Sequence, residues 1–262
     1  MNALFFGTLI LYFIAVVLQF AGTVFKKEKI SRSAWWLFLA ALAAHTAFIA
    51  VRGIAAHRLP LSNQFEFSVA FAWGVSLMLL VARTRFRAEW LTVVAIPMAF
   101  LILSYAALQP REITELMPAL RSSWFAFHIG SAVFSYSSFV LAGCAGLRYV
   151  LIAKKADADA LRLHQMDYMS YRLIALGFLL LTVTILTGAI WAEQAWSAFW
   201  TWDPKEVWAL ITWIIYAVYL HLRLRAKHSG VKMAWFAIIA VPVVLFTFAG
   251  VNTLMSGLHS YG

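Results

Sequence analysis

The segment WAEQAWSAFWTWDPKEVW, from Trp191 to Trp208, stands between two strongly apolar segments of the chain. Six of the chain's 12 tryptophans lie between Trp191 and Trp213. Tryptophan has apolar ring faces and a polar N–H, so it favours the boundary between a membrane and water. Residues 191–213, the tryptophan segment, therefore predict a loop at a membrane surface that joins two spanning helices.

The chain as a whole is too apolar for a soluble domain. Of its 262 residues, 63% are hydrophobic and only 12% are charged, and the mean hydropathy is +0.81. A soluble domain covers its surface with more polar residues than this. At about 20 residues for each span, eight apolar segments qualify, at roughly 3–25, 34–51, 65–82, 90–108, 123–153, 172–192, 207–222 and 233–256. They predict an all-α integral membrane protein, with residues 1–262 forming a single polytopic domain.

The lysines and arginines predict how the spans are oriented, because the loops and helix ends on the cytoplasmic side carry an excess of them. With the amino terminus outside, 16 of the 21 basic residues lie on the inner side. The five outer ones are Arg52, Arg58, Arg111, Arg121 and Lys205. Both termini are therefore expected on the outer side of a bacterial cytoplasmic membrane, and the tryptophan segment with them.

The charge and the cysteine count exclude two classes of function. The net charge of +10 is dispersed in short clusters between apolar segments rather than gathered in a basic domain, which argues against nucleic acid as a partner. The only cysteine, Cys144, lies within the fifth span, so an internal disulfide or a CxxC redox pair is excluded. Any thiol chemistry must use the thiols of another molecule.

The tryptophan segment has one ordinary feature and one unusual feature. Asp203-Pro204-Lys205-Glu206 has the form of a helix start, with Asp as the N-cap and Glu three residues later. An aromatic belt would spread its tryptophans over all helix ends, whereas half of them are concentrated here. Clustered indoles can stack on a flat ligand such as a porphyrin. The platform residues expected for it are Trp191, Trp196, Trp200, Trp202, Asp203 and Trp208.

Two histidines accompany these indoles on the expected outer side. His128 lies six residues after Ser122, about 9 Å below the outer surface, and His259 follows the last span. A single histidine near a helix end is usually just hydrogen-bonded, but two imidazoles beside an indole platform are typical of axial haem ligation. Haem propionates are anionic, and Arg58, Arg121 and Lys205 are possible contacts for them, although simple solvation explains these charges equally well.

His221 is a candidate for a second site. It lies 15 residues after Glu206, about 22 Å deeper along a helix, so it cannot share one iron with His128. An ionisable residue within a span is costly and points to function, although this one is close enough to the inner end to reach water. His45 lies about 10 Å higher than His221 in the membrane, so the two are a poor pair. A ligand from another subunit fits better.

These motifs together resemble the CcsA (ResC) family of cytochrome c biogenesis proteins, the membrane subunit of the system II haem lyase. The resemblance rests on the tryptophan-rich WWD segment, on PLSNQFEF at 60–67, on His128 within SWFAFH and on the terminal GLHSYG, and it spans most of the chain.

The resemblance implies that His128 and His259 hold haem b at the outer face beside the WWD segment. It implies that His221 receives haem nearer the inner side, with a partner ligand from a CcsB-type subunit, since no CcsB-like region is fused to this chain. Haem is then presented to a CxxCH apocytochrome c. The chain would be the haem-presenting subunit of a holocytochrome c synthase, and no residue looks like a catalytic nucleophile, acid or base. The family motif that includes Asn63 and Glu66 has no role that chemistry alone assigns.

Three other functions fit part of the pattern. A haem-binding membrane regulator of tetrapyrrole synthesis would bind haem and leave cytochrome c maturation intact when deleted. A haem chaperone of the CcmC type would handle haem without lyase activity, but the DPKE form of the segment and the eight spans favour the haem-lyase interpretation given above. A quinone-linked electron carrier would place paired histidines within the membrane, where only His45 and His221 stand.

Overall fold

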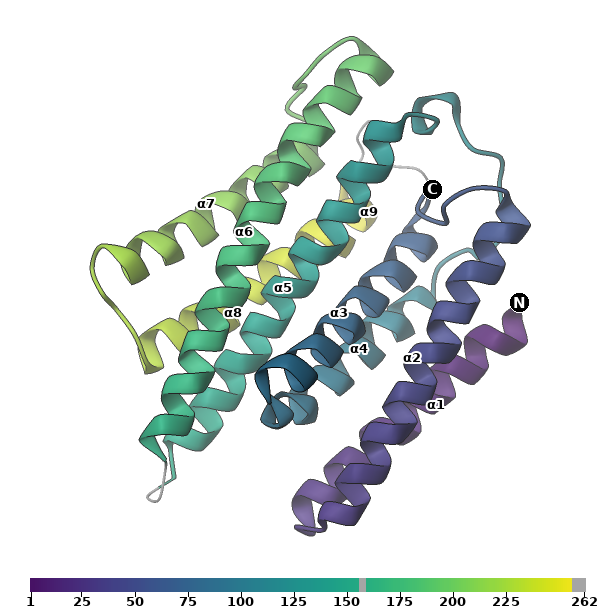
Figure 1. The fold of residues 1–262 in the computed structure, drawn as a ribbon. Coiled ribbons are helices and arrows are strands. Elements are labelled where there is room, and N and C mark those ends of the chain that lie inside the picture. Colours follow the sequence, from purple (N-terminus) through teal and green to yellow (C-terminus); the bar gives the residue numbers. More distant parts are fainter. Residues whose placement is uncertain (156–158, 256–262) are drawn as a thin grey trace. The chain divides into compact units, whose positions relative to one another are not determined.

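A computed structural model describes residues 1–155 and 159–255. Throughout these residues the regular elements are helices, and no strand occurs in them (Figure 1). The described chain forms two compact units, one from Met1 to Glu115 and one that begins at Leu116. The single polytopic domain expected over 1–262 stays a prediction.

The first unit contains four long helices and a short 3₁₀ turn. They are α1 (Asn2–Val24), α2 (Glu28–Ala56), α3 (Gln64–Phe86), η1 (Glu89–Leu91) and α4 (Thr92–Ala106). α1 packs along α2 and α4, and α3 packs along α4. Phe5, Phe48 and Phe65 meet at one end of this bundle with ring centroids 5.3–6.1 Å apart. The outward faces of α1 remain apolar and exposed, as lipid contact requires.

The second unit is built around a close pair of long helices. Its elements are η2 (Pro118–Leu120), α5 (Ser123–Ala153), α6 (Ala160–Trp196), α7 (Pro204–Leu224), α8 (Val231–Leu245), the π-helix η3 (Phe246–Gly250) and α9 (Val251–Leu254). α5 packs along both α6 and α8. Gly143 and Gly146 face α8, and Gly177 faces Phe139 of α5. Small residues let the helix backbones approach closely, which drives helix packing where lipid surrounds the protein.

The eight predicted spans are confirmed. Eight helical segments of the described chain are long and apolar enough to cross a membrane. Their bounds are Asn2–Val24, Glu28–Ala56, Gln64–Phe86, Glu89–Ala106, Ser123–Ala153, Ala160–Trp196, Pro204–Leu224 and Val231–Leu254. The chain is therefore a multi-pass membrane protein.

The connection predicted at 191–213 is shorter than expected, because helices enter it from both sides. α6 extends to Trp196 and α7 begins at Pro204, so only residues 197–203 are non-helical. Glu193, Gln194 and Ala195 are good helix formers and continue α6 beyond its apolar part. α6 also begins earlier than predicted, at Ala160, because Asp159 caps it by accepting from the Leu161 N–H at 2.9 Å.

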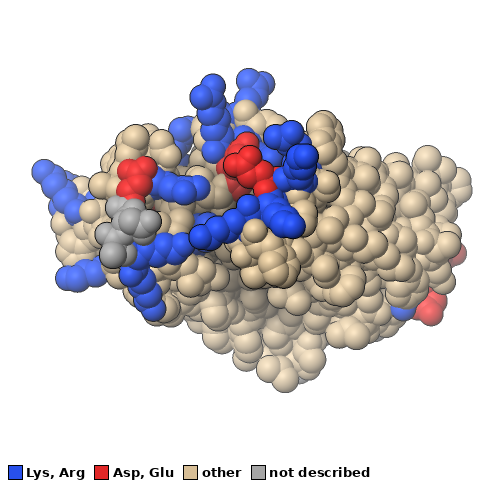
Figure 2. Space-filling view, turned by 90° about the horizontal axis from the view of Figure 1, so that it is seen from below, with Lys and Arg blue, Asp and Glu red and all other residues tan. Residues whose placement is uncertain are grey.

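Basic residues gather at the turns that join consecutive helices. Lys26 and Lys27 lie between α1 and α2, Arg87 follows α3, and Arg225 and Lys227 lie between α7 and α8. In the view from below, Figure 2 shows many Lys and Arg side chains and few Asp and Glu. This is the distribution from which the inner side was predicted. The orientation itself stays a prediction.

Candidate functional site

His128 lies near the start of α5 and leans against α6. Its Nδ1 is 2.8 Å from the carbonyl oxygen of Thr184. A carbonyl oxygen can only accept, so Nδ1 carries the proton and, in the neutral ring, Nε2 carries the lone pair. Neutral imidazole binds a metal through such a lone pair. A carbonyl oxygen that accepts from the other ring nitrogen commonly fixes the ring in this form.

Trp191 supports the imidazole rather than standing open to solvent. Its indole stacks on His128, with ring centroids 5.8 Å apart and an interplanar angle of 21°. The side chain is 1% exposed, and Nε1 donates to the Ala119 carbonyl at 2.7 Å. Phe125 and Trp196 pack around it at centroid distances of 5.2 and 4.8 Å. The indole is thus fixed on several sides.

The other tryptophans of the segment lie beyond the end of α6 or on α7. Trp200 and Trp202 meet edge to face at 5.8 Å, and the Trp202 side chain is 69% exposed. Trp208, on α7, packs against Phe246 of the π-helix at 4.4 Å. Trp213 donates from Nε1 to Thr182 Oγ1 at 2.9 Å, and so ties α7 to α6. Among these, Trp202 offers the most open indole face.

The predicted helix start at Asp203 is confirmed. Asp203 and Glu206 form a reciprocal capping box with Pro204 at the first helical position. The Glu206 carboxylate also accepts from the Thr201 N–H at 2.8 Å, so it holds the end of the non-helical connection. Both carboxylates therefore have ordinary roles at the start of α7.

The three candidates for propionate contacts have different surroundings. Arg58 lies in the first unit and donates to Glu66, with Nη1 2.7 Å from Oε2. Arg121 is exposed and bonds only weakly to the Leu116 carbonyl, at 3.3 Å. Lys205 lies in the first turn of α7, beside Asp203. Of the three, Arg121 and Lys205 are in the same unit as His128.

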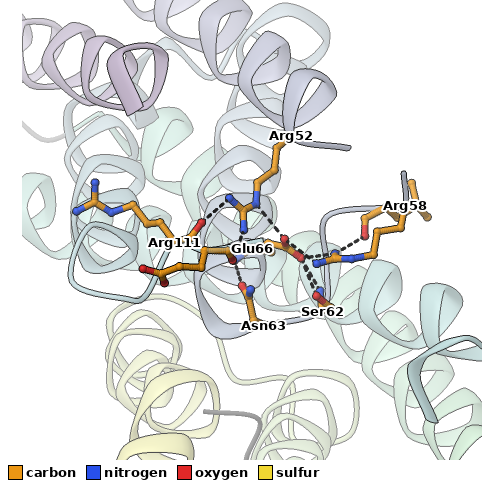
Figure 3. Close-up of polar contacts among 8 residues, drawn as sticks. Arg52, Arg58, Ser62, Asn63, Glu66 and Arg111 are labelled. Atoms are coloured by element: carbon orange, nitrogen blue, oxygen red, sulfur yellow. Dashed lines mark hydrogen bonds and ion pairs between the residues drawn. The ribbon is translucent and has the colours of Figure 1, made fainter. Parts of the chain in front are cut away.

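Glu66 is the centre of a buried charge cluster at one end of the first unit (Figure 3). Its carboxylate accepts from Arg52 Nε at 2.9 Å, from Arg58 and from both the N–H and the hydroxyl of Ser62 at 2.8 and 3.0 Å. Asn63 caps α3 by accepting from the Glu66 N–H at 2.9 Å. The motif whose role the sequence left open is thus a helix cap joined to a buried ion cluster.

Arg52 extends this cluster to the segment after α4. Its Nη1 donates to the Arg111 carbonyl at 2.9 Å and its Nη2 to the Glu112 carbonyl at 3.3 Å. Its side chain is 3% exposed. By its position in the sequence, Arg52 is only one of the five outer charges. The signal available in the sequence was a basic residue at the end of one span, followed by an acidic residue at the start of the next.

His221 lies in the last turn of α7, with an exposed side chain. Asp167 of α6 ties the end of α7 to the start of α8, because its carboxylate accepts from Arg223 Nη1 and from the Gly230 N–H, both at 3.0 Å. His259 lies outside the described residues. The predicted pairing of His128 with His259 therefore stays a prediction.

His45, by contrast, is enclosed in the first unit. It has no exposed surface, and its Nδ1 is 3.3 Å from the hydroxyl of Tyr12. Tyr12 in turn donates to Ser76 Oγ at 2.9 Å. These bonds link α1, α2 and α3 through polar groups.

Comparison with known proteins identifies the family. The family model described as Cytochrome C assembly protein matches residues 61–259. The chain belongs to this family. Its members at similar length include "Cytochrome c biogenesis protein CcsA" of Prochlorococcus marinus (strain MIT 9301), 33% identical over 98% of this chain and 93% of the relative. The protein of the same name from Guillardia theta is 31% identical over 97% of this chain and 94% of the relative.

One solved structure has a fold similar to that of this chain. The chain named "Cytochrome c Heme Lyase CcmF" superposes with a TM-score of 0.74 and 14% sequence identity, over 98% of this chain and 46% of that chain. At this identity the likeness shows the fold alone. The relatives confirm the resemblance to the CcsA family, and the shared fold confirms the all-α membrane architecture.

Proposed function

We propose that the chain binds haem b and delivers it for cytochrome c maturation, as the haem-presenting subunit of a holocytochrome c synthase. Family membership supports cytochrome c assembly as the process. The observation that carries the haem site is the hydrogen bond from His128 Nδ1 to the Thr184 carbonyl, which leaves Nε2 with the lone pair that an iron requires.

In this proposal His128 is one axial ligand and His259 the other. Trp191 holds the His128 ring from behind, and the more exposed indoles, Trp202 above all, pack against the porphyrin. Arg121 and Lys205 lie in the same unit as His128 and are the better candidates for the propionates. The sequence offers no dedicated nucleophile, acid or base for the reaction, and we propose that positioning of the reactants carries it.

The attachment step uses the client's own chemistry. Each thiol of a CxxCH apocytochrome adds across one haem vinyl group, so that an S–C bond forms and the thiol hydrogen passes to the other vinyl carbon. No oxidant or reductant is consumed in this addition. Haem bound covalently to the client no longer needs the two histidines, and the client's own histidine can replace one of them.

His221 is proposed as a ligand of a second site, nearer the inner side of the membrane, completed by a CcsB-type partner. Its place in the last turn of α7, about 22 Å from Glu206 along the helix, separates it from His128. We place the chain in a bacterial cytoplasmic membrane with both termini outside, on the distribution of basic residues.

Haem spectra of purified variants test the proposal. The chain is purified with and without a CcsB-type partner, and His128→Ala, His259→Ala and His221→Ala are compared with the unmodified protein. We expect His128→Ala and His259→Ala to lose most of the outer-site haem, and His221→Ala to reduce haem only in the complex with the partner. Normal haem content and cytochrome c assembly in all three variants would reject the proposed sites. Haem loss without an effect on cytochrome c assembly would favour the tetrapyrrole regulator.

A further inference from the structure

Gly188 lies in the interior of α6, where a glycine needs a reason. The helix continues on both sides of it, from Ala160 to Trp196, with an ordinary helical backbone. Glycine destabilises a helix interior relative to alanine, because it loses more backbone freedom and contributes no packing. Its presence here is therefore not explained by a turn or by backbone geometry.

The space beside Gly188 is filled by the His128 ring. A Cβ atom at position 188 would lie 2.7 Å from His128 Nδ1 and 2.8 Å from Cε1. Real Cβ contacts essentially never fall below 3.0 Å. Because Nδ1 is also the atom that donates to Thr184, one turn earlier on the same helix, a methyl group at 188 acts directly on that hydrogen bond.

The His128 ring has little freedom to move aside. Trp191 stacks on it from α6, and the buried indole is itself held by its bond to Ala119. The His128 backbone is tied as well, because its carbonyl accepts from Ser131 Oγ at 2.9 Å, and Ser131 Oγ lies 2.9 Å from Thr184 Oγ1. A displaced ring must therefore break the bond to Thr184 or part from the indole.

The geometry points to Gly188 as a positioning residue for the haem-binding imidazole. Its bare backbone lets the ring lie against α6, where the Thr184 carbonyl sets the tautomer and the direction of Nε2. This inference rests on the proposed function of His128 as an axial ligand, and adds a residue that acts on the iron only through His128.

The test compares three glycine-to-alanine variants of the full chain, purified in detergent and titrated with haem b. In Gly188→Ala the bond between His128 Nε2 and the iron is weakened. We expect haem affinity to fall about 10-fold, as when a metal-binding histidine loses the hydrogen bond that orients it. The spectrum should shift from low-spin to high-spin. Free imidazole can then supply the missing ligand, and should restore the low-spin spectrum.

Two controls separate ring displacement from general disruption of the helix pair. Gly130→Ala is on the same turn of α5 as Ser131 but faces open space, so it should bind haem normally. At Gly177 an added Cβ would lie 2.7 Å from Phe139, so Gly177→Ala disturbs the same α5–α6 contact away from His128. It should lower the thermal midpoint and leave the spectrum of bound haem low-spin.

The outcomes distinguish this inference from the proposed function. If His128→Ala retains normal haem, the axial role of His128 is wrong. If His128→Ala loses haem but Gly188→Ala keeps normal affinity and spectrum, only the positioning role of Gly188 is wrong. Equal spectral changes in Gly188→Ala and Gly177→Ala, without rescue by imidazole, would also overturn it.

Discussion

Glu66 shares one buried carboxylate between two arginines, Arg52 and Arg58. Its side chain has no exposed surface, and its carboxylate accepts hydrogen bonds from Arg52, Arg58 and Ser62. Such a cluster stabilises a fold only while each member is paired, because an unpaired charge in an apolar interior is costly. At the scale of single residues, this cluster is the place where one substitution should have the largest effect on stability.

We predict that Glu66→Gln destabilises the protein by about 3–5 kcal/mol, since it leaves the buried Arg52 and the largely buried Arg58 without a countercharge. Thermal unfolding in detergent measures the change. Glu89→Gln is the matched control, because Glu89 is 74% exposed and lies 3.7 Å from Arg83. A pair of this kind contributes about 0–1 kcal/mol. Equal thermal midpoints for the two variants would contradict the prediction.

The helices that border the tryptophan segment begin and end for local reasons. α6 ends at Trp196 with Ser197 in the left-handed conformation, at a φ of 58°, and α7 begins where Asp203 and Glu206 cap each other. The short connection is thus held by its own backbone and carboxylates. At this scale Asp203 has two possible roles, as a helix cap or as a charge that faces a ligand.

Substitution of Asp203 separates these roles. Asp203→Ala removes the cap and should cost about 1 kcal/mol of stability, whereas Asp203→Asn should cost little, because asparagine caps a helix as well as aspartate does. Thermal unfolding and haem content are measured for both variants. If Asp203→Asn loses haem as much as Asp203→Ala does while it keeps its stability, the carboxylate charge has a role that capping does not explain.

At the scale of the whole molecule, most basic residues lie near every second connection, those after α1, α3, α5 and α7, and the positive-inside rule predicts that these connections face the cytoplasm. Ser197, after α6, and Lys227, between α7 and α8, lie at opposite ends of α7. Both side chains are exposed. They are therefore suitable positions for a topology measurement.

Cysteines at these positions report the orientation. In a Cys144→Ser background, a membrane-impermeant thiol reagent added to intact cells should label Ser197→Cys and leave Lys227→Cys unlabelled until the membrane is opened. Cys144 is buried, with 3% of its surface exposed, so little labelling of it is expected even without the substitution. The opposite labelling pattern would place the termini and the tryptophan segment on the inner side.

The sequence by itself determined the spans, the helix start at Asp203 and the family. These follow from local properties, since a helix in lipid must satisfy its own backbone hydrogen bonds and must be apolar over a length set by the bilayer. Capping likewise depends on residues only three positions apart. The extent of α6 was underestimated, because its polar ends are helical by propensity and capping rather than by hydrophobicity.

Only the tertiary structure decided what surrounds the functional candidates. The bond between His128 and Thr184 joins residues 56 positions apart, and that between Arg52 and Glu112 joins residues 60 positions apart. Neither has a periodic signal in the sequence, because the partner in each case is a backbone carbonyl, which every residue carries. Gly188 and the buried Trp191 acquire their meaning in the same way, from the side chain that helix packing places beside them.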